Sequence, residues 1–262
     1  MDTSGGFGWF CGALAGVAAG LVNALAGGGS LISYPALTAL GLSPLMANLT
    51  NTVALTPGYL GAAWSQRRDL AGQGERILWL VPAACLGGLT GAWLLLRGDE
   101  RLFAALVPWL ILFGSALLAL QTPLRGWLRA ASDHRSGPSR QQRQRQRLGP
   151  LLVAIALAAV YGGYFGAGLS VILLAVLGLA LDDNLTRLNG LKQLLSFATN
   201  ACAALLLSAS GRVDWAMALI IAVSSIVGGA LGGALAHRLQ GEVLRWLVVM
   251  LGALVGLGLL LR

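Results

Sequence analysis

The sequence predicts an all-α polytopic membrane protein made of two inverted-topology repeats, each with a glycine-broken pair of short helices and three long transmembrane helices. Hydrophobic residues make up 56% of the 262 residues and charged residues only 11%, with a mean hydropathy of +0.75. Water-soluble domains carry roughly a quarter charged residues, so this chain cannot cover a water-facing surface. Apolar segments recur along the chain in two sets of five, and glycine clusters interrupt both sets at corresponding places.

Each set of five segments is expected to form one repeat, the first at residues 1–121 and the second at 149–262. The segments lie at about 8–25, 30–41, 44–66, 76–97 and 102–121, then at about 148–164, 168–181, 184–208, 213–236 and 242–261. A helix needs about 20 residues to span a hydrocarbon core about 30 Å thick. The last three segments of each set are long enough, whereas the first two are short and meet at glycines.

The ends of two long segments carry capping signals. Ser43 and Pro44 are typical of a helix start, with serine as the N-cap and proline at the first helical position. We expect Asp182 and Asp183 to cap the helix that follows them in the second repeat.

The linker at 122–148 contains seven arginines and is predicted to be disordered and cytoplasmic. An arginine-rich stretch can bind nucleic acid, but between membrane segments it favours a role in topology and contact with anionic lipid headgroups, without a nucleic-acid partner. Each repeat crosses the membrane three or five times, depending on whether its short segments re-enter or cross. Because both counts are odd, the second repeat is inverted, and both termini are expected in the periplasm of a bacterial inner membrane.

Several kinds of chemistry lack the residues they need. Cys11, Cys85 and Cys202 lie in apolar segments without CxxC spacing, so we expect core residues and no disulfide. His134 and His237 are isolated, so we expect no metal site and no cofactor. An intramembrane enzyme is a weak alternative, since the sequence has neither a Ser/His/Asp set nor an HExxH motif.

The two glycine breaks are the candidate binding site. Inside a membrane, irregular backbone survives only where protein or water buries it, and the exposed N-terminus of the helix after a break favours an anion. Backbone N–H groups at both breaks are the candidate ligands, namely Gly28, Gly29, Ser30, Gly166, Gly168 and Ser170. The alternative is close helix packing through small residues, which we expect at Gly87, Gly88, Gly91, Gly228 and Gly229.

A polar stripe follows each break, at helical spacing along the next long segment. We expect side-chain hydrogen bonds to the anion from Asn51, Thr52, Asn189 and Asn200. Lys192, the single lysine, lies about 12 Å into its helix and would balance the charge. The alternative for Lys192 is a side chain that extends to the cytoplasmic surface.

These segments resemble a known family. "GLVNALAGGGSLISYPAL" with "ANLTNTVAL", and "YGGYFGAGLSVILLAVLGL" with "RLNGLKQLLSFATNACAAL", are similar to the TauE/SafE family of sulfite exporters. The resemblance implies a permease moving sulfite or related organosulfur anions outward, with Asn189 and Lys192 meeting the family's Asn-x-x-Lys. Leu49-Thr50-Asn51 departs from the Ala-Thr-Ser that is frequent in the family.

The predicted function is therefore export of a small sulfur oxyanion, with sulfite favoured, by alternating access around a midplane site. An anion channel using the same site is the alternative. The sequence leaves self-association into a homo-oligomer open.

Overall fold

The computed structural model describes residues 5–25, 27–133, 148–181, 183–235 and 241–261, and all regular structure within these ranges is helical. The first half contains α1 (Gly6–Leu25), α2 (Ser30–Ala39), α3 (Pro44–Ser65), the 3₁₀ helix η1 (Arg67–Leu70), α4 (Gly74–Arg97) and α5 (Glu100–Asp133). The second half contains α7 (Leu148–Tyr164), α8 (Leu169–Ala180), α9 (Leu185–Ser208), α10 (Trp215–Leu235) and α11 (Gly241–Leu260). The predicted all-α polytopic class is confirmed.

Helix boundaries follow the apolar segments closely, with two differences. α1 has 20 residues and is long enough to cross, so in the first broken pair only α2 is short, whereas α7 of the second pair, with 17 residues, remains among the shorter helices. α5 continues to Asp133, whereas a disordered linker was expected from residue 122. Leu128, which is 3% exposed, contacts Gly178 of α8 and thereby anchors the extra helical turns. The remaining linker residues 134–147, Asp182 and both histidines lie outside the described residues.

The outer surface is apolar, as a lipid-facing surface must be. Five described helices, namely α1, α4, α5, α9 and α11, are long and apolar enough to cross a membrane. Large hydrophobic side chains stand exposed on the surface, including Leu86 at 65%, Leu157 at 66%, Leu205 at 73% and Leu254 at 68%. Polar residues such as Asn48, Asn51 and Lys192 are buried instead. This inside-out distribution is consistent with a multi-pass membrane protein.

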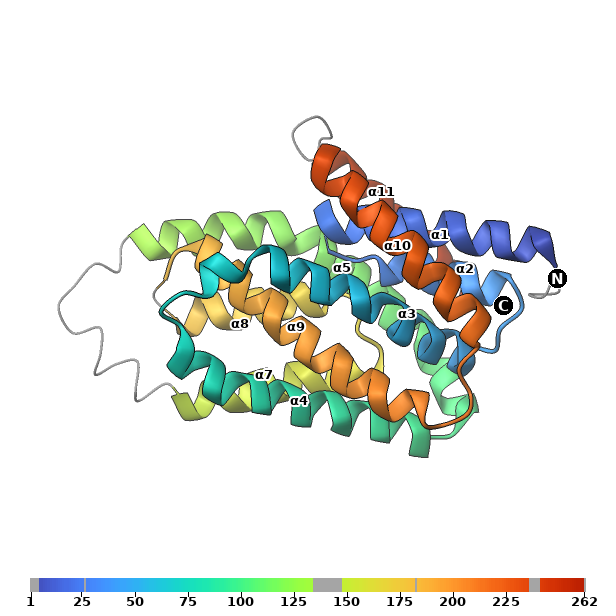
Figure 1. Cartoon of the computed structure of the whole chain (residues 1–262), viewed down its shortest axis with the longest axis horizontal. Helices are drawn as coiled ribbons and strands as arrows, with labels where there is room; N and C mark the ends of the chain where they lie inside the picture. The colour runs from blue at the N-terminus through green and yellow to red at the C-terminus, as the bar shows by residue number, and fades with distance from the viewer. Residues whose placement is uncertain (1–4, 26, 134–147, 182, 236–240, 262) are drawn as a thin grey trace.

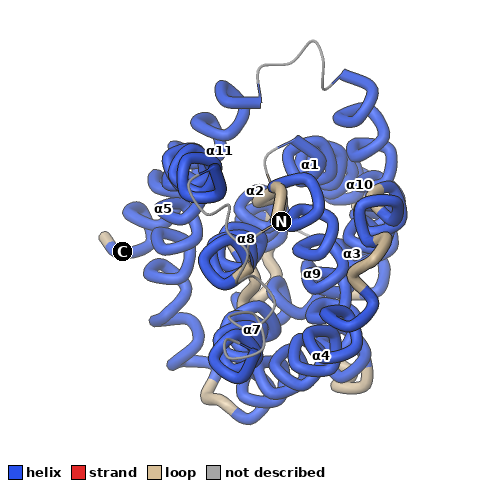
Figure 2. Tube along the Cα trace, turned by 90° about the vertical axis from the view of Figure 1, so that its left-hand side faces the viewer, coloured by secondary structure: helices blue, strands red, loops and turns tan. Residues whose placement is uncertain are grey.

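The halves are interleaved rather than side by side. In Figure 1, α1 begins and α11 ends near one end of the molecule, while α5 ends and α7 begins at the opposite end, here called the linker end. Figure 2 shows α2, α8 and α9 toward the middle, and the polar residues of α3 are buried against this interior. The central helices carry both glycine breaks and both polar stripes, so the fold gathers them inside.

Contacts between helices match when the halves are exchanged. α1 packs on α10 and α7 on α4; α3 contacts α10 and α9 contacts α4; α3 meets α9, and α5 meets α11. Exchange of two equivalent halves produces such pairs, but the inverted two-fold relation itself stays a prediction.

Three of these pairs are held by glycines, as the small-residue alternative predicted. A Cβ atom on Gly88 would overlap the carbonyl oxygen of Thr199, and one on Gly91 would overlap that of Val160. Gly228 approaches the carbonyl of Val17 in the same way. Close backbone approach of this kind is how small residues stabilise helix pairs in membranes.

Candidate functional site at the two glycine breaks

The two glycine breaks lie against each other. A Cβ atom on Gly27 would be 3.6 Å from the Cβ of Ser170, which is the second residue of α8. Gly27 and Gly168 have φ angles of 70° and 80°, in the left-handed region that favours glycine. Glycine therefore lets the chain reverse sharply at each of these two positions, and the two reversals bring the starts of α2 and α8 together.

The short helices place this meeting point deep inside the molecule. α2 has 10 residues and α8 has 12, so they rise about 15 and 18 Å, which is roughly half of a 30 Å hydrocarbon core. Neither can cross the core alone, and each leads back toward the end of the molecule from which its hairpin entered. The electropositive N-termini of α2 and α8 are consequently internal.

Several backbone N–H groups at the breaks have no backbone partner among the described residues. Within the described part of the chain, no backbone acceptor pairs with the N–H groups of Gly28, Gly29, Ser30, Gly168 or Ser170. The N–H of Gly166 differs, because it donates to the carbonyl of Tyr161 at 3.2 Å and closes the end of α7. Unused N–H groups at a helix start are suited to an anion.

Side chains of α2 and α3 surround the first break. The Ser33 hydroxyl donates to Asn51 Oδ1 at 2.5 Å and also lies 3.1 Å from the carbonyl of Gly29. Since Asn51 accepts through its oxygen, its amide nitrogen remains able to donate to another acceptor. Tyr59, two turns further along α3, brings its hydroxyl near the Ser30 side chain. Thr52 donates to the carbonyl of Asn48 at 3.0 Å, within its own helix.

The α9 stripe contributes a buried cation. Lys192 is 5% exposed, so its side chain does not extend to the surface in this structure. Asn200, also 5% exposed, donates to the carbonyl of Ser196 at 2.8 Å. Asn189 lies elsewhere: its Nδ2 donates to Gln66 Oε1 at 2.6 Å, near the linker end. Asn189 is ten residues before Thr199, which contacts Gly162 of α7, a separation of roughly 15 Å along α9.

Four residues near the breaks were not among the predicted ligands: Ser33, Tyr34, Asn48 and Tyr59. Asn48 donates from Nδ2 to the carbonyl of Tyr164, at the end of α7, at 2.8 Å. Helical spacing gave a signal for Asn48 and Tyr59, which share a face with Asn51 and Thr52. Ser33 and Tyr34 gave little signal, because their role depends on the fold-back of α2 against α3.

Aromatic residues cover the second break. The rings of Tyr34 and Phe165 pack edge-to-face with centroids 5.4 Å apart, and Phe103 packs against Tyr164 at 5.7 Å. The Tyr161 hydroxyl donates to the carbonyl of Ala167 at 2.5 Å and braces the turn. Aromatic rings therefore pack over the turn that joins α7 to α8.

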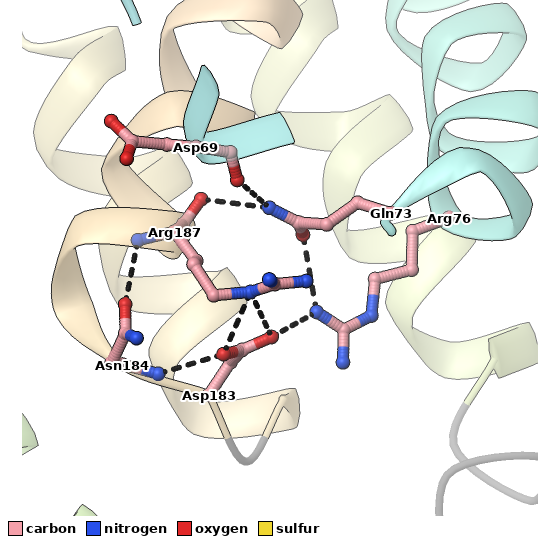
Figure 3. A network of polar contacts seen from close by, with 6 residues as sticks. All are labelled: Asp69, Gln73, Arg76, Asp183, Asn184 and Arg187. Atoms are coloured by element: carbon pink, nitrogen blue, oxygen red, sulfur yellow. Dashed lines mark hydrogen bonds and ion pairs between the residues drawn. The ribbon is translucent and has the colours of Figure 1, made fainter. Parts of the chain in front are cut away.

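The linker end is sealed by a polar network that joins the halves (Figure 3). Arg76 of α4 pairs with Asp183 at 2.6 Å, and Asp183 also pairs with Arg187 at 3.2 Å. Gln73 donates to the carbonyl oxygens of Asp69 and Arg187, at 2.9 and 3.1 Å. Asn184, rather than the expected Asp183, caps α9 by accepting from the Arg187 N–H at 2.8 Å. The Asp183 carboxylate instead pairs with Arg76 and Arg187.

The charge state of Asp183 follows from these contacts. Burial by itself would raise the pKa of Asp183, but hydrogen bonds from Arg76 and from the Asn184 backbone, with the charges of Arg76 and Arg187, bring the pKa below its ordinary value. Asp183 therefore stays ionised at neutral pH, and the network joining α4 to α9 is charged.

Apolar outer helices around buried polar stripes and two internal helix starts define an all-α, multi-pass membrane protein with a central polar site. The sequence profile described as "Sulfite exporter TauE/SafE" matches residues 12–259, and the chain belongs to this family of membrane transporters. A "Probable membrane transporter protein" of Haemophilus influenzae is 29% identical over 236 residues, covering 90% of this chain and 88% of that protein. The "Probable membrane transporter protein YfcA" of Escherichia coli strain K12 is 27% identical over 244 residues, covering 92% and 86%. No solved structure matches.

Proposed function

We propose that this transporter exports a small sulfur oxyanion, sulfite being the best fit, across the bacterial inner membrane by alternating access. The observation that carries the proposal is the contact between Gly27 and Ser170, which joins two internal helix starts at one place. Helix N-termini from both halves supply fixed partial positive charge and unused N–H donors, and these replace the water that a small oxyanion loses.

Side chains complete the site. Ser30 and Ser170 lie at the two helix starts, and Asn51 directs its amide nitrogen away from its bond with Ser33. Lys192, which is buried on α9, adds positive charge to this part of the molecule. The family to which the chain belongs supports sulfur chemistry for the anion.

The direction of transport follows from the membrane potential. With the linker end in the cytoplasm, Arg76, which pairs with Asp183 there, also faces the cytoplasm. The same holds for Arg67 and Arg68 of η1, which packs on the start of α9, so the positive-inside rule is met. An anion leaving a cell whose interior is negative gains about 2.3 kcal/mol per charge per 100 mV. Export therefore needs no carboxylate proton relay.

Alternating access needs both seals to open in turn. The aromatic rings close the site toward the termini, and the Arg76–Asp183 network closes it toward the linker end. Rocking one half against the other would break one seal while the other stays closed.

The test is flux from proteoliposomes that contain the purified full-length protein. We expect saturable sulfite efflux and counterflow, both strongly reduced in Asn51→Ala and Ser170→Ala. Thr90→Ala is the matched control, because Thr90 is an exposed residue of α4 that donates only to the carbonyl of Leu86. Flux that never saturates and lacks counterflow would favour a channel, and absence of flux for sulfite, thiosulfate and sulfonates would reject the proposal.

A further inference from the structure

Asn48 holds a buried acceptor that no described residue satisfies. Asn48 lies on α3, one turn before Asn51, and is 1% exposed. Its Nδ2 donates to the carbonyl of Tyr164, next to the second glycine break, while its Oδ1 is buried without a hydrogen-bond partner. Buried polar atoms are nearly always paired, so an orphaned oxygen beside a binding site points to something that the ligand provides.

The orientation of the Asn48 amide is fixed by chemistry. The two ends of an asparagine amide are often interchangeable, and their assignment then rests on the hydrogen-bond network. Here the neighbour is a carbonyl oxygen, which can only accept, so the nitrogen must face Tyr164. The other end is therefore an acceptor, and only a donor can satisfy it.

Tyr34 supplies a second unpaired group beside the same segment. Its ring packs on Phe165, the residue after Tyr164, and its buried Oη has no partner among the described residues. Tyr34 is 2% exposed and follows Ser33, the partner of Asn51. Asn48 from α3 and Tyr34 from α2 thus flank residues 164–165, one with an acceptor and one with a hydroxyl.

These two groups distinguish between oxyanions. A fully deprotonated oxyanion presents only lone pairs, so Asn48 Oδ1 would repel it even while N–H donors attract it. A singly charged oxyanion that carries an O–H group can donate to Asn48 and accept from Tyr34. Burial increases the penalty for a wrong pairing, because no bulk water is present to compensate.

We propose that Asn48 and Tyr34 select a singly charged, hydroxyl-bearing oxyanion, such as hydrogensulfite or a hydroxyalkanesulfonate, over anions without a donor. The Asn48 oxygen accepts the ligand's O–H, and the Tyr34 hydroxyl donates to one of its charged oxygens. This inference rests on the proposed function, because it assigns the ligand's protonation state at the same site.

The test compares pairs of sulfonates that have equal charge and differ only in a hydroxyl. Methanesulfonate with hydroxymethanesulfonate, and ethanesulfonate with 2-hydroxyethanesulfonate, would compete with labelled sulfite for flux in proteoliposomes. We expect the hydroxylated member to compete about tenfold better, the value of one neutral hydrogen bond. Sulfite flux at fixed total concentration should also rise as the pH falls and hydrogensulfite accumulates.

Two variants assign the preference to residues. Asn48→Leu should abolish the preference for the hydroxylated sulfonate, so that both members of each pair compete about equally. The matched control Thr50→Val should keep the preference. Thr50 lies on the same helix, and its hydroxyl accepts a hydrogen bond from the Asp214 N–H of the second half at 3.0 Å. Thr50→Val therefore also removes one hydrogen bond between the halves. Tyr34→Phe keeps the ring and removes only the hydroxyl. Both sulfonates of each pair should then compete about tenfold more weakly for sulfite flux, while the ratio between them stays unchanged.

Each outcome decides a different point. Loss of the hydroxyl preference in Asn48→Leu, with its retention in Thr50→Val, supports the assignment. No preference in the native protein, with sulfite still transported, overturns this inference and leaves the proposed function standing. A preference that survives Asn48→Leu, or unchanged competition in Tyr34→Phe, overturns the role of that residue. Absence of flux for every sulfur anion rejects both proposals.

Discussion

Lys192 and Asn189 show how two residues of one stripe acquire different surroundings. Both lie on α9 three residues apart, yet Lys192 is 5% exposed and Asn189 bonds Gln66 at the end of α3. Gly190 lets η1 approach α9 here, because a Cβ on Gly190 would be 2.9 Å from the Cβ of Asp69. Asn189 is thus held at the contact between η1 and α9, whereas Lys192, one turn further along, is buried. Position along a helix therefore does not by itself decide which polar residue serves the site.

We expect Lys192→Met to lower sulfite flux by about ten- to a hundredfold, because the methionine keeps the length and removes the charge that balances the anion. Flux into proteoliposomes at several sulfite concentrations measures the change. Arg97→Met is the control, since Arg97 is exposed at the end of α4 and stacks on Trp93. Equal flux in both variants would remove Lys192 from the site.

At the scale of helices, glycines hold the paired elements and a polar network fixes the ends. α4 and α7 approach through Gly87, Gly88 and Gly91, each lying against backbone of a neighbouring helix. Gly61 of α3, in contrast, has open space where its Cβ would be. A methyl group would therefore clash at the packed positions, whereas Gly61 has room for one.

Gly91→Ala should destabilise the protein by several kcal/mol, because the methyl group would overlap the carbonyl of Val160 and push α4 from α7. Gly61→Ala should be neutral or stabilise it by up to about 1 kcal/mol, since alanine favours the helix. Thermal unfolding of both variants in detergent measures the difference. Similar unfolding temperatures would contradict the close packing.

Asp183→Asn should weaken the linker end by about 1–2 kcal/mol at neutral pH, where the ionised carboxylate pairs with Arg76 and Arg187. Because the folded-state pKa of Asp183 is lowered, its contribution is present above the unfolded value and is lost as the pH falls through the folded value. Native protein and variant should therefore differ between pH 5 and 8, and converge only as the pH falls below the lowered folded-state pKa of Asp183. A difference that persists unchanged at still more acidic pH would exclude an ionised Asp183.

Sequence reasoning succeeded where a local signal decides the outcome. Ser43 caps α3 by accepting from the Met46 N–H at 3.4 Å, and glycines end α1 and α7 close to the expected positions. The prediction that Asp183 caps α9 was wrong, because the Asp183 carboxylate pairs with Arg76 of α4. Reasoning from local signals also missed the last turns of α5, because their stability comes from contact with α8. Long-range partners are not encoded in local spacing.

At the scale of the whole molecule, the two halves exchange partners through a common centre. α3 meets α9, and each half's outer helices pack on the other half. Asn48 bonds Tyr164 and Arg76 bonds Asp183, so polar contacts join the halves both beside the glycine breaks and at the linker end. A rocking motion must exchange these contacts, whereas a static pore need not.

A reversible cross-link at the linker end should stop transport if the halves rock. In a background with Cys11, Cys85 and Cys202 replaced by alanine, Gln66→Cys with Asn189→Cys places two thiols where the native side chains hydrogen-bond at 2.6 Å. A short disulfide-forming reagent should abolish sulfite flux, and reductant should restore it. The single-cysteine variants, treated identically, serve as controls. Undiminished flux in the cross-linked protein would contradict alternating access.

The most direct test of the shared anion site is to locate a bound oxyanion. Selenite is the selenium analogue of sulfite, and its anomalous scattering would mark its position in crystals of the full-length protein. We expect a selenium peak between Gly27 and Ser170, within hydrogen-bond distance of the N–H groups at the starts of α2 and α8. A peak elsewhere, or none at selenite concentrations that saturate competition with sulfite, would contradict a shared anion site at the two breaks.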